Sequence, residues 1–203
     1  TIDKLHSLMT ISFLIKRFIY SNILGKKYLR NREPQYQKFL AFQVKRKIKK
    51  INPDAILCAG TSPIAYLRTK KPIISWIDST FDQLLNFYPQ YENLCTETIE
   101  NGKKTTQIAL ENCDLMIFSS QWAKESTLRN YVVDPEKIKV VPFGANLICN
   151  RNKDDILALI RSKSNLVCNL LFVGKDWFRK GGDFAVTVAE ELNQRGMSTE
   201  LNV

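Results

Sequence analysis

The sequence predicts an α/β fold built on a parallel β-sheet. From residue 54 onward, short apolar runs of strand length alternate with longer segments of helical periodicity, and turns rich in glycine and proline separate them. The alternation stops at residues 142–146 (PFGAN) and then resumes, which indicates two domains, 1–145 and 146–203. We therefore expect a parallel sheet with helices on both faces, followed by the start of a second sheet.

Two helices are expected before the first strand. Apolar side chains recur at helical spacing across residues 5–24, but Lys16 and Arg17 interrupt them, so this segment is too short and too charged to span a bilayer. Its apolar stripe consists of Leu8, Ile11, Leu14, Ile15, Phe18 and Ile19. The second helix begins near Pro34, because proline is tolerated in a first helical turn, and ends at residues 52–54 (NPD).

The remaining elements follow in order along the chain. The expected strands of the first domain are residues 55–59, 72–77, 114–119 and 137–141. Its expected helices are a short one after turn 60–63, a long one at 90–112 whose middle is weakened by Asn101-Gly102, and one at 120–131. In the second domain we expect a helix at 154–162, a strand at 169–173, a helix at 182–195 and a strand from residue 199.

The positive charge of the chain is concentrated in its first quarter. The 30 Lys and Arg against 20 Asp and Glu give a net charge of +10. Residues 1–50 hold 13 basic and 2 acidic side chains, a net +11, which leaves 17 basic and 18 acidic side chains, a net −1, for the remainder. With no groove-reading motif or interleaved aromatic residues, this distribution argues against a nucleic-acid partner. It leaves open that residues 1–50 dock on an anionic membrane or another polyanion, or simply form a solvated helix face.

Cysteine and histidine usage restricts the chemistry. The five cysteines form no C-x-x-C pair, and the sequence contains no glycosylation sequon or cleavable signal peptide. Reduced thiols and a cytoplasmic location, peripheral to the membrane if the basic segment docks there, fit this pattern best. His6 is the only histidine, which excludes a histidine-rich metal site and makes a Ser-His-Asp triad improbable.

One loop has the composition of a phosphate-binding turn. Residues 174–182 (GKDWFRKGG) join a predicted strand to a predicted helix, and ligands of parallel α/β sheets bind beyond the carboxyl ends of the strands. Its glycines let backbone N–H groups approach an anion, and Lys175 and Lys180 add cationic donors. The loop matches neither the P-loop nor the G-x-G-x-x-G pattern. A solvated basic turn explains the composition equally well.

Two segments, VVPFGAN and LLFVGKDWFRKGGDFAVTVAEEL, resemble the family-4 retaining glycosyltransferases of the GT-B fold. WIDSTFDQLLNFYPQYENL and SSQWA are similar to the same family, so the resemblance runs from about residue 35 to the end. It implies an incomplete, acceptor-side Rossmann-like domain and the start of a donor-binding Rossmann-like domain. The implied substrates are a nucleotide-diphosphate sugar and a carbohydrate or lipid-linked acceptor, and no metal cofactor is expected.

The resemblance also implies roles for individual residues. Gly174, Lys175, Lys180 and Gly181 take the positions that bind the donor diphosphate, with Lys175 where arginine is commoner in the family. Lysine at that position keeps the charge but loses the bidentate fork of arginine.

Asp78, at the end of strand 72–77, lies near the position of a catalytically important histidine in many members of the family. A carboxylate there would hydrogen-bond a substrate hydroxyl. An Asx turn or a helix N-cap is an equally good interpretation. Gly60 and Thr61 would line the same cleft or form only a tight turn, and Gly144 would serve as a hinge.

Two parts of the family pattern are missing from the sequence. These are the Glu-x7-Glu element of the donor domain, and the first strand with its glycine-rich loop. The resemblance therefore implies a fragment cut at both ends, with negligible transferase activity on its own. The sugar, the nucleotide, the acceptor and the oligomeric state are not specified by the sequence.

Overall fold

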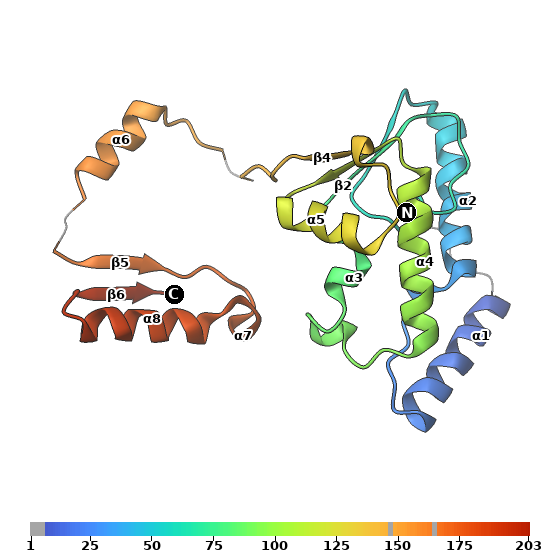
Figure 1. The fold of residues 1–203 in the computed structure, drawn as a ribbon, viewed down its shortest axis with the longest axis horizontal. Helices are drawn as coiled ribbons and strands as arrows, with labels where there is room; N and C mark the ends of the chain where they lie inside the picture. Colours follow the sequence, from blue (N-terminus) through green and yellow to red (C-terminus); the bar gives the residue numbers. More distant parts are fainter. Residues whose placement is uncertain (1–6, 146–147, 164–165) are drawn as a thin grey trace. The chain divides into compact units, whose positions relative to one another are not determined.

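The protein is represented by a computed structural model that describes residues 7–145, 148–163 and 166–203, with side chains from residue 10 onward. The chain forms two compact units, Thr1–Ala145 and Asn146–Val203 (Figure 1). His6, the side chain of Leu8 and Asn146 of the predicted PFGAN turn lie outside the described set.

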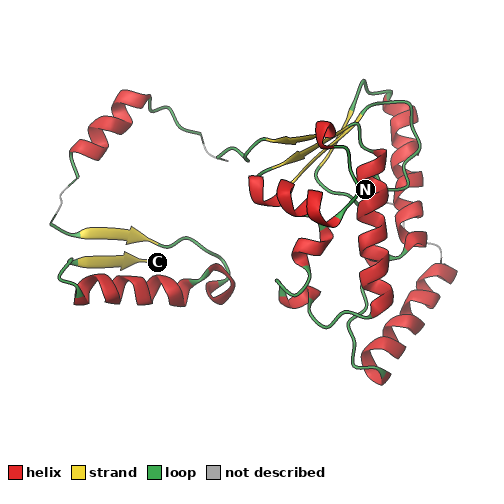
Figure 2. Ribbon diagram, in the orientation of Figure 1, coloured by secondary structure: helices red, strands yellow, loops and turns green. Residues whose placement is uncertain are grey.

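The first unit contains a four-stranded sheet (Figure 2). Its strands are β1 (Ile56–Cys58), β2 (Ile73–Ile77), β3 (Leu115–Phe118) and β4 (Ile138–Val140). They pair in the order β1-β2-β3-β4, and every pair is parallel. The α/β class and the parallel sheet predicted from the sequence are thus confirmed.

Three helices complete the core of this unit: α2 (Pro34–Ile51), α4 (Thr96–Asn112) and α5 (Gln121–Asn130). Alternate residues of the central strands are buried, including Ile77 of β2 and Phe118 of β3, because successive strand residues point to opposite faces. These side chains share one cluster with Ala41 of α2, Leu110 of α4 and Ala123 of α5.

The helices cover one face of the sheet, which corrects the expectation of helices on both faces. Residues of α2, α4 and α5 all join the cluster that contains the buried strand face. The opposite face is less covered: Leu57 of β1 is 68% exposed, and Lys139 of β4 is exposed. The strand order explains this. Each strand is added on the same side of the preceding one, and crossover connections between parallel strands are right-handed, so every crossover passes over the same face of the sheet.

Two predicted helices also differ in the structure. The segment after β1 forms a single turn closed by Ala65 N–H and Thr61 O at 3.1 Å, and not a helix. The long helix begins at Thr96 and not at residue 90, because Pro89–Tyr91 forms a separate 3-10 turn and Asn93 has a positive φ of 53°. A left-handed residue cannot continue a right-handed helix.

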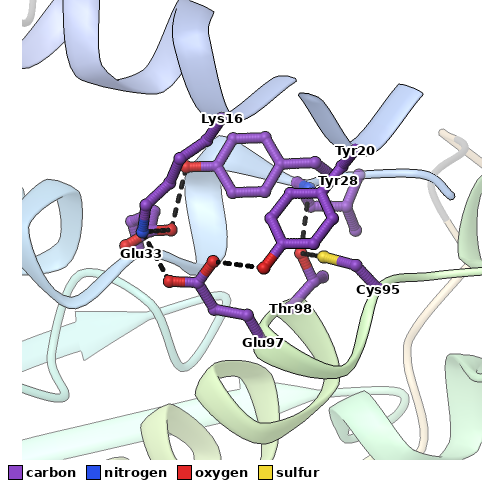
Figure 3. Close-up of polar contacts among 8 residues, drawn as sticks. Lys16, Tyr20, Tyr28, Glu33, Cys95, Glu97 and Thr98 are labelled. Atoms are coloured by element: carbon purple, nitrogen blue, oxygen red, sulfur yellow. Dashed lines mark hydrogen bonds and ion pairs between the residues drawn. The ribbon is translucent and has the colours of Figure 1, made fainter. Parts of the chain in front are cut away.

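A polar cluster attaches the N-terminal helix α1 (Ser7–Phe18) to this core (Figure 3). The Lys16 ammonium donates to Glu33 Oε1 at 2.9 Å and to Glu97 Oε1 at 2.5 Å. Tyr20 OH donates to the other oxygen of Glu97 at 3.0 Å, and Tyr28 OH donates to Glu33 at 2.9 Å. Glu97 lies in the first turn of α4 and Glu33 immediately before α2, so the cluster joins three helices.

The orientation that this cluster imposes leaves the apolar stripe of α1 facing solvent. Phe13, on the side of Lys16, is 3% exposed. Ile11, Leu14, Ile15 and Phe18 are between 52% and 59% exposed. Among the described residues, no helix is long and apolar enough to cross a bilayer.

The second unit contains a parallel strand pair, β5 (Cys168–Leu171) and β6 (Thr199–Asn202), joined through α8 (Gly182–Gln194). A further helix, α6 (Lys153–Arg161), precedes β5. Between β5 and α8 lies a four-residue helix that was not predicted, α7 (Trp177–Lys180). Asp176 caps it: Oδ1 accepts from Arg179 N–H at 3.3 Å.

Candidate functional site

A cavity of about 490 Å³ opens in the first unit where β1 and β2 end. Gly60 and Thr61 follow β1, Asp78 directly follows β2, and all three line the cavity. The structure therefore brings together three residues for which the sequence left open either a shared cleft or separate local turns. The reason is the parallel pairing of β1 with β2, which places the carboxyl ends of both strands at the same edge.

Asp78 presents an exposed carboxylate to this cavity. Its Oδ1 accepts from the neighbouring Ser79 hydroxyl at 3.2 Å. The N-cap of the following helix, α3 (Phe81–Leu84), is Thr80, whose backbone N–H donates to Gln83 Oε1 at 2.8 Å. The N-cap interpretation of Asp78 is therefore wrong, and its role toward a substrate stays a prediction.

Aromatic side chains form another wall of the cavity. Trp76 of β2 donates its indole N–H to Val141 O at 3.0 Å, and its ring centroid lies 5.4 Å from that of Phe143. These contacts hold the segment after β4 beside the cavity. Gly144 follows this segment without a positive φ, and a Cβ there would meet nothing within 4 Å. Its backbone conformation does not require glycine, and the hinge assignment stays a prediction.

Arg32 also lines this cavity, although no sequence pattern predicts it as a site residue. It is 8% exposed, and its guanidinium carbon lies 4.5 Å from the centroid of the Phe81 ring. The Phe81 ring in turn lies against Gly102 of α4, where a methyl group would overlap it. In the sequence Arg32 is one of thirteen cations in a basic segment, and no local pattern distinguishes it.

In the second unit, the loop after β5 folds back on itself. A Cβ on Gly174 would lie 3.0 Å from the Cβ of Lys180, so the two ends of the loop are in contact. Gly181 has a φ of 80° and joins α7 to α8 without a break, a conformation that favours glycine. Gly182 contacts the Trp177 indole so closely that a side chain would overlap the ring. Trp177 is therefore a packing residue of the loop.

The cations of this loop differ in their partners. Arg179 Nε lies 3.2 Å from Asp176 Oδ2. Lys175 and Lys180 are exposed, and neither is paired with a carboxylate of the described ranges. The loop thus presents two lysines just before the N-terminus of the thirteen-residue helix α8. Cations beside a helix N-terminus suit an anionic phosphate.

Neither site has the composition of a metal centre. In residues 7–145, 148–163 and 166–203, no group of three or more His, Cys, Asp and Glu side chains is arranged to hold a metal ion. The five cysteines are free thiols. The groups that remain for chemistry are the Asp78 carboxylate and the Arg32 guanidinium in the first unit, and the two loop lysines in the second.

Comparisons with known proteins place these sites in context. The sequence model of Glycosyltransferase Family 4 matches residues 17–147, which include every residue lining the Asp78 cavity and end before the glycine–lysine loop. Among solved structures, the chain is similar to a glycosyltransferase from Rickettsia africae ESF-5, with 15% sequence identity and a TM-score of 0.42. That similarity covers 94% of this chain and 57% of the solved one, so the chain spans little more than half the length of that protein. No curated protein sequence matches significantly.

Proposed function

The chain belongs to Glycosyltransferase Family 4, and we propose on that basis that it transfers a sugar from a nucleotide-diphosphate donor to an acceptor hydroxyl with retention of configuration. The observation that carries the proposal is the family match over residues 17–147. A second support is the loop at 174–182, whose two lysines have the charge that a diphosphate requires.

The proposed reaction takes place on one face of the sugar. The acceptor oxygen bonds to the anomeric carbon on the side from which the nucleoside diphosphate departs, and the bond from that carbon to the diphosphate oxygen breaks. The acceptor proton passes to the departing phosphate oxygen. No metal is required in this scheme, because Lys175 and Lys180 neutralise the charge that develops on the leaving group.

Asp78 has a different task in this proposal. A carboxylate accepts hydrogen bonds, so it orients a hydroxyl group of the acceptor or of the donor sugar. Asp78→Asn removes the charge at nearly constant size. In a form of the protein that is long enough to have transferase activity, we expect it to lower kcat more than it changes the affinity for the nucleoside diphosphate.

The test of the donor site is a binding measurement. Lys180→Met should weaken the binding of a nucleoside diphosphate, measured by isothermal titration calorimetry with UDP, GDP and ADP, by about tenfold or more, because one charge-assisted hydrogen bond is lost. Lys180→Arg should keep most of the affinity. The matched control is Arg195→Met, which removes an equal charge at the opposite end of α8, where Arg195 pairs with Glu191 at 2.7 Å. Equal affinity in the Lys180→Met and control proteins would contradict the assignment.

A second candidate function is docking on an acidic membrane, and it is favoured by the exposed stripe of α1. Ile11, Ile15 and Phe18 are each more than half exposed to solvent, whereas Lys16 is held by its ion pair with Glu33. A cavity of about 610 Å³ adjoins this helix and is lined by Arg17, Lys27 and Arg30 without a carboxylate. An apolar helix face bordered by cations is typical of helices that lie in the interface of anionic bilayers.

The structure reduces the number of cations that are available for docking on an acidic membrane. Lys16 is held by two glutamates and Arg32 is buried, so neither adds to the attraction. Each remaining cation near acidic lipid contributes about 1 kcal/mol. Co-sedimentation with vesicles of phosphatidylcholine, with and without phosphatidylglycerol, tests this function.

A further inference from the structure

Arg32 is a buried cation, and the part of the chain that the structure describes offers it no carboxylate counter-ion. Arg32 is 8% exposed, and its buried Nε atom has no hydrogen-bond partner among the described residues. Within the described ranges no carboxylate pairs with it. The adjacent Glu33 carboxylate is bound to other groups, since its Oε1 atom accepts hydrogen bonds from Lys16 Nζ and from Tyr28 OH at 2.9 Å each.

This arrangement is unfavourable unless an anion is present. Arginine stays protonated in proteins, so burial cannot be relieved by loss of a proton. The face of the Phe81 ring, 4.5 Å from the guanidinium carbon, compensates only in part. A buried charge that lacks its partner is costly, and an anion that binds beside it would relieve this cost.

The surroundings of Arg32 indicate where that partner binds. Arg32 lines the cavity that also receives Asp78, Thr61 and Ser79. At about 490 Å³ the cavity has the size of a small-molecule site. It therefore combines one guanidinium for an oxyanion with one carboxylate for a hydroxyl group.

We propose that Arg32 binds the oxyanion, a phosphate or a carboxylate, of a hydroxylated acceptor whose reacting end lies toward Asp78. The planar guanidinium suits both oxyanions, because each accepts two parallel N–H donors. The identification of the ligand as the acceptor rests on the proposed glycosyl transfer. The anion site itself rests on the burial of Arg32 alone.

The test is the binding of small hydroxylated anions to the 203-residue chain in the absence of a sugar donor. Glycerol 3-phosphate and glycerate serve as phosphate and carboxylate probes, glycerol as the neutral probe and inorganic phosphate as the anion without a hydroxyl group. We expect saturable binding of at least one hydroxylated anion by calorimetry, none of glycerol, and weaker binding of phosphate. Arg32→Met should weaken the binding of the anion at least about tenfold. Arg68 is an exposed arginine outside the cavity, and Arg68→Met should leave the affinity for the anion unchanged.

A stability measurement separates ligand binding from a structural role. Without anions, Arg32→Met should unfold at the same or a higher temperature than the wild type, because it replaces an unpaired buried charge by an apolar side chain of similar length. A lower unfolding temperature together with unchanged anion binding would overturn the proposal. Should Arg32→Met fail to fold, Arg32→Lys keeps the charge without the fork and should still weaken binding.

The remaining outcomes distinguish this proposal from the proposed function. Lys180→Met should retain anion binding at Arg32 while it loses the nucleoside diphosphate. If Arg32→Met weakens only the nucleoside diphosphate, the site belongs to the donor and the acceptor assignment is wrong. If the anion binds through Arg32 and no nucleoside diphosphate binds at all, the glycosyltransferase function fails and the anion site stands.

Discussion

At the scale of single residues, Gly102 determines how one wall of the Asp78 cavity is built. Gly102 lies in the middle of α4, where glycine costs about 1 kcal/mol relative to alanine. Its lack of a side chain allows the Phe81 ring to lie against the helix, and Arg32 packs on the ring. The weak point that the sequence predicts in this helix is thus the place where an aromatic side chain fits.

Gly102→Ala should therefore destabilise the protein in spite of the better helix propensity of alanine. The new methyl group overlaps the Phe81 ring, and overpacking of this kind costs about 1–3 kcal/mol. Urea denaturation measures the change, and Lys104→Ala, at an exposed position of the same helix, is the control. Adding Phe81→Leu to Gly102→Ala should recover part of the loss, because the smaller side chain frees the space. Full additivity of the two changes would contradict this account.

Arg32 illustrates what residue-level sequence reasoning misses. Asp78, Gly60 and Thr61 could be selected because each follows a predicted strand, and parallel strands end at one edge. Arg32 precedes the sheet by more than twenty residues and reaches the cavity only through the packing of its 3-10 turn, Arg30–Arg32, on Phe81. Such burial depends on contacts between distant segments, which local patterns do not encode.

At the scale of elements, periodicity predicts that a helix has two faces but not which face packs inward. The apolar stripe of α1 was predicted correctly in its spacing. The packed side is nevertheless the one with Lys16, because Glu33 and Glu97 are positioned to pair with it. The positions of strands are easier to predict than the packed face of a helix. The ends of β1 to β4 each lie within two residues of the predicted ends, because apolar runs bounded by turns indicate where a strand begins and ends.

The exposed stripe of α1 should control binding to acidic vesicles. Ile15→Gln combined with Phe18→Gln removes two side chains that are 54% and 59% exposed, so we expect circular dichroism to be unchanged and co-sedimentation with phosphatidylglycerol vesicles to fall at least about tenfold. Binding of the wild type should also weaken with added salt, as attraction to acidic lipid does.

The matched control for α1 uses apolar residues exposed elsewhere in the first unit. Ile51→Gln with Val132→Gln changes side chains that are 70% and 84% exposed and should leave vesicle binding intact. An equal loss of vesicle binding in both double variants would indicate nonspecific apolar adsorption and not a specific role of α1. If the α1 variant still binds the vesicles, or if the wild type binds phosphatidylcholine vesicles equally well, docking on an acidic membrane is excluded. The apolar stripe of α1 would then be a contact surface for another protein.

At the scale of the whole molecule, the alternation of strands and helices was sufficient to predict the α/β class and the parallel sheet. It was not sufficient to predict which faces the helices cover, because that depends on strand order. The order β1-β2-β3-β4 places α4 and α5 on one side, whereas an order that reverses would have placed helices on both. Strand order is set by tertiary packing, and no single segment of the sequence specifies it.

Stability should decline in alkali, because buried groups of the first unit resist ionisation in the folded state. Burial, followed by the nearby Cys58 and Asp114, raises the pKa of the Cys113 thiol to about 12 from 9.0. Burial, followed by the hydrogen bond to Glu33, also raises the pKa of Tyr28 above its ordinary 10.0. Above pH 9 the unfolded chain loses the Cys113 proton while the folded chain keeps it, so the unfolding free energy falls as the pH rises, by at most about 1.4 kcal/mol per pH unit for each group. Below pH 9 the thiol is protonated in both states and has no effect. Urea denaturation midpoints measured between neutral pH and pH 10 report this decline. Cys113→Ala should make the decline shallower without abolishing it, because Tyr28 still contributes. An identical dependence of the midpoint on pH in both proteins would show that Cys113 is not the source.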